Sequence, residues 1–134
     1  MRKIAIALAA ATALLSAPAL QARAPKLTGE EKLAKLLEGR VAGEPVSCIN
    51  TMNTRDARVI DKTAIVYDTG RTIYVNRPTN ARWLDSDDIM VTRLTGSQLC
   101  RIDTVQMYDR SSHFYSGFVG LEEFVPYRRV ATRD

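Results

Sequence analysis

The stretch from residue 63 to residue 77, TAIVYDTGRTIYVNR, constrains the fold of this chain more than any other. β-Branched and aromatic residues crowd its two arms, and the segment DTGR supplies a turn between them. Gly70 is able to take the positive φ that a hairpin of this length usually needs. Two pairs of apolar side chains fall on a shared face of their arm: Ile65 with Tyr67, and Ile73 with Val75. The stretch therefore predicts a β-hairpin at the centre of the core.

Other short apolar segments are separated by turn residues and recur about every ten residues. These segments are residues 46–51, 55–60, 88–94, 98–108 and 113–118. A change of phase after Ile102 predicts a β-bulge around residues 103–104. Residues 121–124 are predicted to form one helical turn, which Pro126 ends. The sum predicts a mainly β fold, a small antiparallel barrel or sandwich of five to seven short strands after one N-terminal helix.

The N-terminal helix is predicted from capping and spacing. Thr28 is a candidate N-cap, with Glu31 three residues on as its capping-box partner. One apolar helical face follows, made of Leu33, Leu36, Leu37 and Val41. Residues that end a helix or prevent its return come next, namely Gly39, Gly43 and Pro45. We expect a helix and lead-in over residues 25–45 and a β-domain over residues 46–134.

Residues 1–24 have the pattern of a secretory signal peptide. A basic start leads into an apolar run over residues 4–15, which is too short and Ala-rich for a membrane span. Small residues then offer three cleavage positions, after Ala19, Ala22 or Ala24. We therefore expect a periplasmic or secreted protein that has no membrane span once the signal peptide is removed.

Much of the positive charge belongs to the predicted signal peptide. The chain has 19 Lys and Arg against 15 Asp and Glu, and loss of Arg2, Lys3 and Arg23 lowers the net charge from +4 to +1. The remaining arginines are scattered between acidic residues, whereas nucleic-acid binding needs a clustered basic surface. We expect no nucleic-acid partner.

The chain has two cysteines, Cys48 and Cys100. In an exported chain two cysteines most simply pair with each other, and two buried free thiols are the alternative. A bridge would close a loop of some 50 residues, for which loop-closure entropy gives about 4 kcal/mol of stabilisation.

The sequence offers little catalytic or metal-binding chemistry. His113 is the only histidine, and no nucleophile-elbow pattern surrounds the serines near it, so a turn or strand histidine is favoured over a catalytic one. The aspartates of residues 85–88 do not complete a calcium loop, because Met90 and Gly96 stand where Gly and Glu are needed. No glycine-rich phosphate cradle or zinc ligand set is present. We expect no cofactor and no metal.

Arginine and tyrosine side chains make up the candidate binding surface. Arginine forks and tyrosine hydroxyls suit carboxylates and glycans. The candidate residues, with the only tryptophan added, are Tyr74, Arg77, Trp83, Arg101, Tyr127 and Arg128. In the alternative interpretation these arginines face solvent or pair with acids such as Asp103.

Five segments in a fixed order carry a resemblance to a known family. They are residues 46–49 (VSCI), 59–61 (VID), 73–77 (IYVNR), 99–103 (LCRID) and 120–127 (GLEEFVPY). In these the chain resembles a domain-of-unknown-function family of small exported proteobacterial proteins, over about residues 44–129. The resemblance implies a periplasmic or secreted protein of a Gram-negative bacterium, and it implies no activity and no catalytic residues.

This chain departs from the family in its cysteines. Family members often carry two more, one in the loop that is here residues 80–84 and one near Val119, and both are missing. Their joint absence suits the loss of a second bridge as a unit, which leaves Cys48–Cys100 as the first.

We expect a non-catalytic domain with a binding or structural role in the cell envelope, whose partner is an envelope protein or a glycan. One alternative is an inhibitor of a periplasmic or foreign hydrolase, which would present residues 77–87 as a rigid loop. Another is a small enzyme that uses His113.

Overall fold

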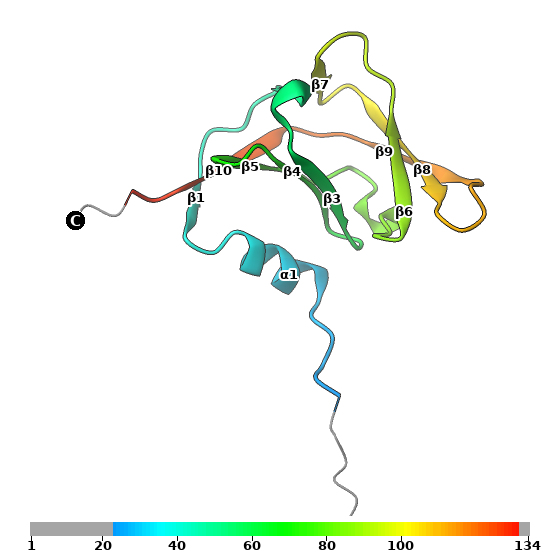
Figure 1. Cartoon of the computed structure of the whole chain (residues 1–134), viewed down its shortest axis with the longest axis horizontal. Helices are drawn as coiled ribbons and strands as arrows, with labels where there is room; N and C mark the ends of the chain where they lie inside the picture. Colours follow the sequence, from blue (N-terminus) through cyan, green and yellow to red (C-terminus); the bar gives the residue numbers. More distant parts are fainter. Residues whose placement is uncertain (1–22, 132–134) are drawn as a thin grey trace, which may run out of the picture.

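The computed structural model describes residues 23–131, so the predicted signal peptide, apart from its last two residues, lies outside the described residues. The described chain forms ten strands in three antiparallel sheets and one α-helix, and the sheets are not closed into a barrel (Figure 1). The predicted mainly β, antiparallel class is confirmed. The strands are more numerous than expected because one predicted strand splits in two and additional strands form at both ends of the domain.

The elements follow one another as α1 (Gly29–Leu36), β1 (Arg40–Ala42), β2 (Cys48–Asn50), η1 (Thr51–Asn53), β3 (Asp56–Ile60), β4 (Ala64–Asp68), β5 (Thr72–Asn76), η2 (Ala81–Trp83), β6 (Asp88–Thr92), β7 (Gln98–Cys100), β8 (Thr104–Asp109), β9 (Tyr115–Gly120) and β10 (Phe124–Arg129). The largest sheet has the order β1-β10-β5-β4-β3. A three-stranded sheet has the order β6-β8-β9, and β2 pairs with β7 alone.

The predicted hairpin is confirmed as β4 and β5, inside the five-stranded sheet, with Tyr67 opposite Tyr74. Its turn depends on Gly70, whose φ is +91°, in the left-handed region that glycine adopts at little cost. The Gly70 N–H donates to Asp68 Oδ1 at 2.6 Å, which fixes the turn.

The five-stranded sheet buries a different core on each face. Ile65 and Tyr67 face a core shared with β2, β7, β8 and β9, whereas Ile73 and Val75 face α1. The first core is completed by Ile49, Leu84, Leu99, Val105, Met107, Val119, Leu121 and Phe124. The second is completed by Leu33, Ile60, Ala64 and Val66. The domain therefore has three layers, with α1 outermost on one side of the sheet (Figure 1).

The capping box of α1 is confirmed. Glu31 N–H donates to Thr28 Oγ1 at 3.2 Å, and Thr28 N–H donates to Glu31 Oε2 at 2.7 Å. The helix ends sooner than the apolar spacing predicted, with Gly39 at a φ of +70° beyond it. Val41, predicted on the helical face, lies instead in the edge strand β1 and is largely exposed.

The predicted bulge around residues 103–104 is wrong, because a turn there separates two strands that belong to different sheets. Strand β7 ends at Cys100 and β8 begins at Thr104. The turn between them is closed by Cys100 N–H donating to Asp103 Oδ2 at 2.7 Å and by Asp103 N–H donating to the Cys100 carbonyl oxygen at 2.9 Å. The change of apolar phase marks this turn, and Ile102 projects from it into solvent.

The predicted helical turn at residues 121–124 is also wrong, because Phe124 begins strand β10. Pro126 lies inside that strand, although proline cannot donate to a sheet ladder. Its carbonyl oxygen accepts the Gly43 N–H at 2.7 Å, and Ala42, opposite Tyr127, is the last residue of β1. An N–H at residue 126 would point toward the chain just beyond the end of β1, so its absence in proline removes no hydrogen bond within the β1–β10 pairing.

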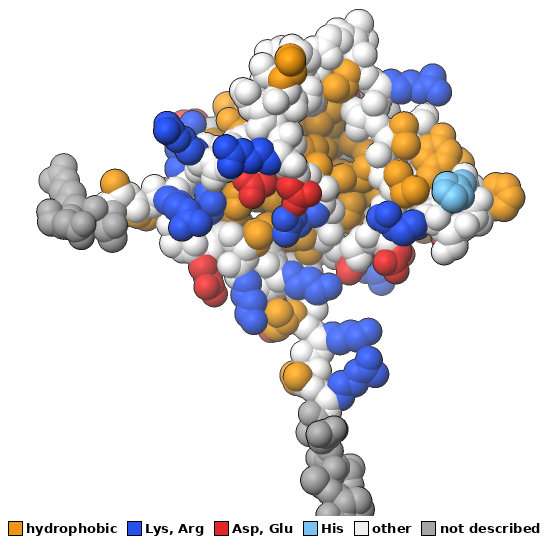
Figure 2. Space-filling view, in the orientation of Figure 1, with side chains coloured by type: hydrophobic (Ala, Val, Ile, Leu, Met, Phe, Trp, Pro, Cys, Tyr) orange, Lys and Arg blue, Asp and Glu red, His pale blue; other side chains and the backbone are white. Residues whose placement is uncertain are grey.

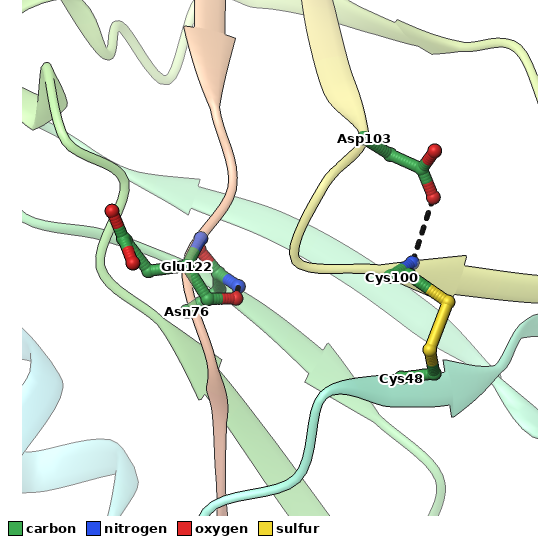
Figure 3. The surroundings of a disulfide bond; sticks show 5 residues. All are labelled: Cys48, Asn76, Cys100, Asp103 and Glu122. Carbon is green, nitrogen blue, oxygen red and sulfur yellow. Dashed lines mark hydrogen bonds between the residues drawn. A yellow bond between two sulfur atoms is a disulfide. The ribbon is translucent and has the colours of Figure 1, made fainter.

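Cys48 and Cys100 form a disulfide, so the alternative of two free thiols is wrong. The two residues lie directly opposite each other on β2 and β7 (Figure 3). The bond joins positions 52 residues apart and links the two strands of the small sheet, β2 and β7, covalently.

Candidate functional site

The predicted arginine and tyrosine residues do not form one surface. Tyr127 packs with the core under α1, whereas Tyr74 packs against the core on the opposite face of the sheet. Side chains alternate along a strand, so Arg128 points to the face opposite Tyr127. Trp83 lies apart from all of these, in η2.

Three of the predicted residues, Arg77, Arg101 and Tyr127, line one groove of about 460 Å³. Arg77 is already engaged there: its Nη1 and Nη2 donate to the two carboxylate oxygens of Glu30 at 2.6 and 3.0 Å. The Arg77 hydrogen bond lowers the pKa of Glu30, and the same bond raises the pKa of Arg77. Because the groove also holds two glutamates and one of its arginines is paired, it offers little net charge to an anion.

A second groove, of about 370 Å³, lies between η2 and β9. We call it the aromatic groove and define it by Trp83, Tyr115 and Phe118, with Met107 also lining it. Its three rings are 63%, 54% and 55% exposed, and Phe114 beside them is 76% exposed. Figure 2 shows hydrophobic side chains gathered around the only histidine at this end of the molecule. Exposed apolar side chains gathered in one place are typical of interaction sites.

Asn80 fixes one wall of the aromatic groove. Its Nδ2 donates to the Phe118 carbonyl oxygen at 2.8 Å, and its Oδ1 accepts the Gly120 N–H at 3.2 Å. The Arg82 guanidinium carbon lies 5.4 Å from the centroid of the Trp83 ring, within the range of a cation–π contact. These contacts hold η2 against the outer edge of β9 and hold Trp83 in place.

Two of the polar side chains that line the aromatic groove, those of Asn80 and Ser116, are used within the protein. Both amide atoms of Asn80 bond to β9, and Ser116 Oγ donates to Asp88 Oδ2 at 2.6 Å. What the groove offers a ligand is therefore mainly aromatic surface, together with the Tyr115 hydroxyl and the Trp83 indole N–H.

His113 lies in the turn before β9, exposed and with a φ of +60°. The backbone N–H of His113 donates to the Asp109 carbonyl oxygen at 2.8 Å. Within residues 23–131 no carboxylate forms an ion pair with the His113 ring. The Asp109 carboxylate accepts from Ser112 and Ser111, and these hydrogen bonds lower the pKa of Asp109. The acid that a catalytic histidine needs is thus engaged elsewhere.

The described part of the chain has no group of three or more His, Cys, Asp or Glu side chains placed to hold a metal ion. The aspartates of residues 85–88 form local contacts instead: Asp87 N–H donates to Asp85 Oδ1 at 2.9 Å.

Sequence reasoning found Trp83 and missed Tyr115 and Phe118, which complete the groove. A signal for them exists, because FYSGF at residues 114–118 places three aromatic rings in a strand that has few apolar partners left to cover them. Asn80 carries no such signal, since its role depends on a strand 40 residues away.

No known family, no curated protein and no solved structure matches this chain. Between residues 23 and 131, no helix is long and apolar enough to cross a membrane.

Proposed function

We propose that this protein is a non-catalytic, protein-binding domain of the cell envelope, exported to the periplasm or secreted by a Gram-negative bacterium. In this proposal it belongs with the domain-of-unknown-function family that its sequence resembles. The observation that carries the binding role is the aromatic groove, with three rings more than half exposed on a disulfide-stabilised scaffold. Aromatic side chains are the residues that most often dominate the energy of protein interfaces.

The chemistry of the groove favours a protein over a glycan. A sugar stacks on aromatic rings but also needs hydrogen-bond partners for its hydroxyls. The side-chain amide of Asn80 and the hydroxyl of Ser116 are both taken up by internal bonds, so among the lining side chains only the Tyr115 hydroxyl and the Trp83 indole N–H are left for a sugar. Apolar side chains of a partner protein need no such partners and gain most from covering Trp83 and Phe118.

The test is crosslinking in the periplasm with a photoreactive phenylalanine analogue in place of Trp83. We expect one protein adduct of defined mass, which is lost when Phe118→Ala is added. The matched control carries the analogue in place of Ile102, which is 85% exposed and lies outside the aromatic groove, and we expect no such adduct from it. An adduct with glycan alone, or equal protein adducts from both positions, would contradict the proposal.

A second candidate function, inhibition of a hydrolase, is favoured by how firmly the loop of residues 77–87 is held. Lys62 N–H donates to the Leu84 carbonyl oxygen at 3.0 Å, and Ser86 N–H donates to Asp61 Oδ1 at 2.7 Å. A rigid loop that presents Trp83 suits insertion into an active-site cleft. Only Trp83 should be replaced to test this, because Leu84 is buried in the core. Unchanged inhibition of a panel of hydrolases by Trp83→Ala would remove this candidate.

The enzyme alternative rests on His113 alone. It requires that His113→Ala abolish a measurable hydrolytic activity, and retention of that activity would remove this alternative.

A further inference from the structure

A cleft opens where the two larger sheets fail to close. The five-stranded sheet ends at β3 and the three-stranded sheet ends at β6, and a cleft of about 320 Å³ lies between these two edges. Its apolar lining comes from Ala57, Tyr67, Leu94 and Leu99. Figure 2 shows a hollow near the centre of this face, with hydrophobic side chains at its floor. We call this space the seam cleft.

One buried polar atom among the described residues that line the seam cleft lacks a partner. Thr54 Oγ1 is buried and has no hydrogen-bond partner among the described residues. Tyr67 also lines the cleft and is only 6% exposed. Burial raises the pKa of Tyr67, so its hydroxyl stays protonated and able to donate. Unpaired polar groups in an apolar site are costly and are usually satisfied by a bound molecule.

The charge at the mouth of the cleft is positive. Arg55 lines both the seam cleft and an adjoining hollow that Arg71 also lines, and neither arginine pairs with an acid among the described residues. Among the described residues, Asp56 is the one acid that lines the cleft, and its carboxylate already accepts from Arg58. One arginine without an acidic partner among the described residues therefore lines the cleft and a second lines the adjoining hollow, whereas much of the cleft lining is apolar.

We propose that the seam cleft binds a free aliphatic carboxylate. The chain of the ligand lies between β3 and β6, against Ala57, Leu94 and Leu99. Its carboxylate lies at Arg55 and accepts from the Thr54 and Tyr67 hydroxyls, and Arg71 in the adjoining hollow adds positive charge nearby. This assignment satisfies the unpaired Thr54 hydroxyl, the Arg55 guanidinium and the apolar walls with one class of molecule, and it is independent of the aromatic groove.

The test is titration of the folded domain with decanoate, below its micellar concentration, followed by NMR and calorimetry. We expect saturable binding, with the largest shifts at residues 54–57 and at Leu94 and Leu99. Decanol, which lacks the charge, should bind at least tenfold more weakly. Acetate, which lacks the chain, should not bind.

Three variants separate the parts of the site. Arg55→Gln should weaken decanoate binding about tenfold, by loss of a charge-assisted hydrogen bond. The matched control Arg129→Gln removes the same charge from β10, three strands away from β3, and should leave binding unchanged. Tyr67→Phe keeps the ring and loses only the hydroxyl, so it should weaken binding without lowering the melting temperature. A merely structural role of Tyr67 predicts no change in binding.

Ala57→Phe should fill the cleft and abolish binding while the amide spectrum stays folded. The proposal is overturned if decanoate does not bind the folded protein, if decanol binds as tightly, or if Arg55→Gln and Arg129→Gln behave alike. Binding to phosphatidylglycerol vesicles without binding to decanoate would also overturn it, because the source would then be a membrane surface and not a free carboxylate.

Discussion

The side chain of Asn76 pairs with the backbone of Glu122 through both of its polar atoms (Figure 3). Its Nδ2 donates to the Glu122 carbonyl oxygen at 2.6 Å, and its Oδ1 accepts the Glu122 N–H at 3.2 Å. Asn76 is the last residue of β5 and is fully buried. Its amide thus takes the place of a backbone partner for the segment that leads into β10.

Replacement of Asn76 should be among the most destabilising polar substitutions in this chain. Asn76→Ala leaves the Glu122 N–H and carbonyl oxygen without their partner, and we expect a loss of about 2–3 kcal/mol in the free energy of unfolding. Urea unfolding measures it. The matched control is Asn80→Ala, which also removes two hydrogen bonds but from a more exposed position, and should cost about 1 kcal/mol. Equal costs would show that burial does not set the effect.

The disulfide should supply a large share of the stability of so small a domain. Cys48 and Cys100 are 52 residues apart, and loss of a cross-link of this span should cost about 4 kcal/mol through the entropy of the unfolded chain. The double variant Cys48→Ser/Cys100→Ser should therefore unfold at much lower urea than the oxidised protein. Reduction of the wild type should reproduce that shift, and identical midpoints before and after reduction would contradict the prediction.

Gly29 is required by a close approach of α1 to the turn before β4. A Cβ atom at this position would lie 1.9 Å from Thr63 Oγ1 and 2.7 Å from the Asp61 carbonyl oxygen. Gly29→Ala should therefore push α1 away from the sheet and cost about 1–3 kcal/mol, although alanine is the better helix former. Hydrogen exchange at Leu33, the buried residue of the helix, measures the displacement. Faster exchange is expected, and unchanged exchange would contradict the prediction.

The features that the sequence predicted correctly are those set by local chemistry. The hairpin turn depends on Gly70, and the capping box needs only Thr28 and Glu31 three residues apart. The disulfide followed from having only two cysteines in a chain with an export pattern. Each of these signals lies within a few residues or depends on a simple count.

The features that the sequence predicted wrongly depend on pairing between distant segments. Pro126 was expected to stop a helical turn, but it lies in strand β10. The strand tolerates a proline there because β1, more than 80 residues earlier, ends before it reaches the position where an N–H from residue 126 would be needed. The phase change after Ile102 was interpreted as a bulge, but Asp103 closes a turn between two sheets. Nothing local distinguishes these cases.

The candidate site could be predicted only in part for the same reason. Tyr74 and Tyr127 were grouped by residue type, but the register of β5 against β10 places them on opposite faces of the sheet. Trp83 was named correctly as a surface residue, yet its partners Tyr115 and Phe118 come from a strand over 30 residues further on. Register and strand order decide which side chains meet, and a single sequence does not supply them.

The pair of Glu30 and Arg77 should make the docking of α1 dependent on pH. The Arg77 hydrogen bond lowers the pKa of Glu30 from its ordinary value of 4.5. A carboxylate with a depressed pKa in the folded state stabilises that state fully above its unfolded pKa, and the contribution is lost as the pH falls through the folded pKa. The protection of the Leu33 amide should therefore be constant above about pH 4.5 and weaken below it.

The decisive measurement is a carboxyl titration of Glu30 by NMR in two variants. In Arg77→Gln the midpoint of Glu30 should rise toward 4.5, because the donor that stabilises its charged form is gone. The matched control Arg101→Gln removes the other arginine of the same groove, which makes no contact with Glu30, and should leave the midpoint in place. Both side chains of the Glu30–Arg77 pair are more than half exposed, so high salt should weaken the effect by screening. Equal shifts in the two variants would mean that the nearby arginine charges act on Glu30 at a distance, and that the fork of Arg77 does not set its acidity.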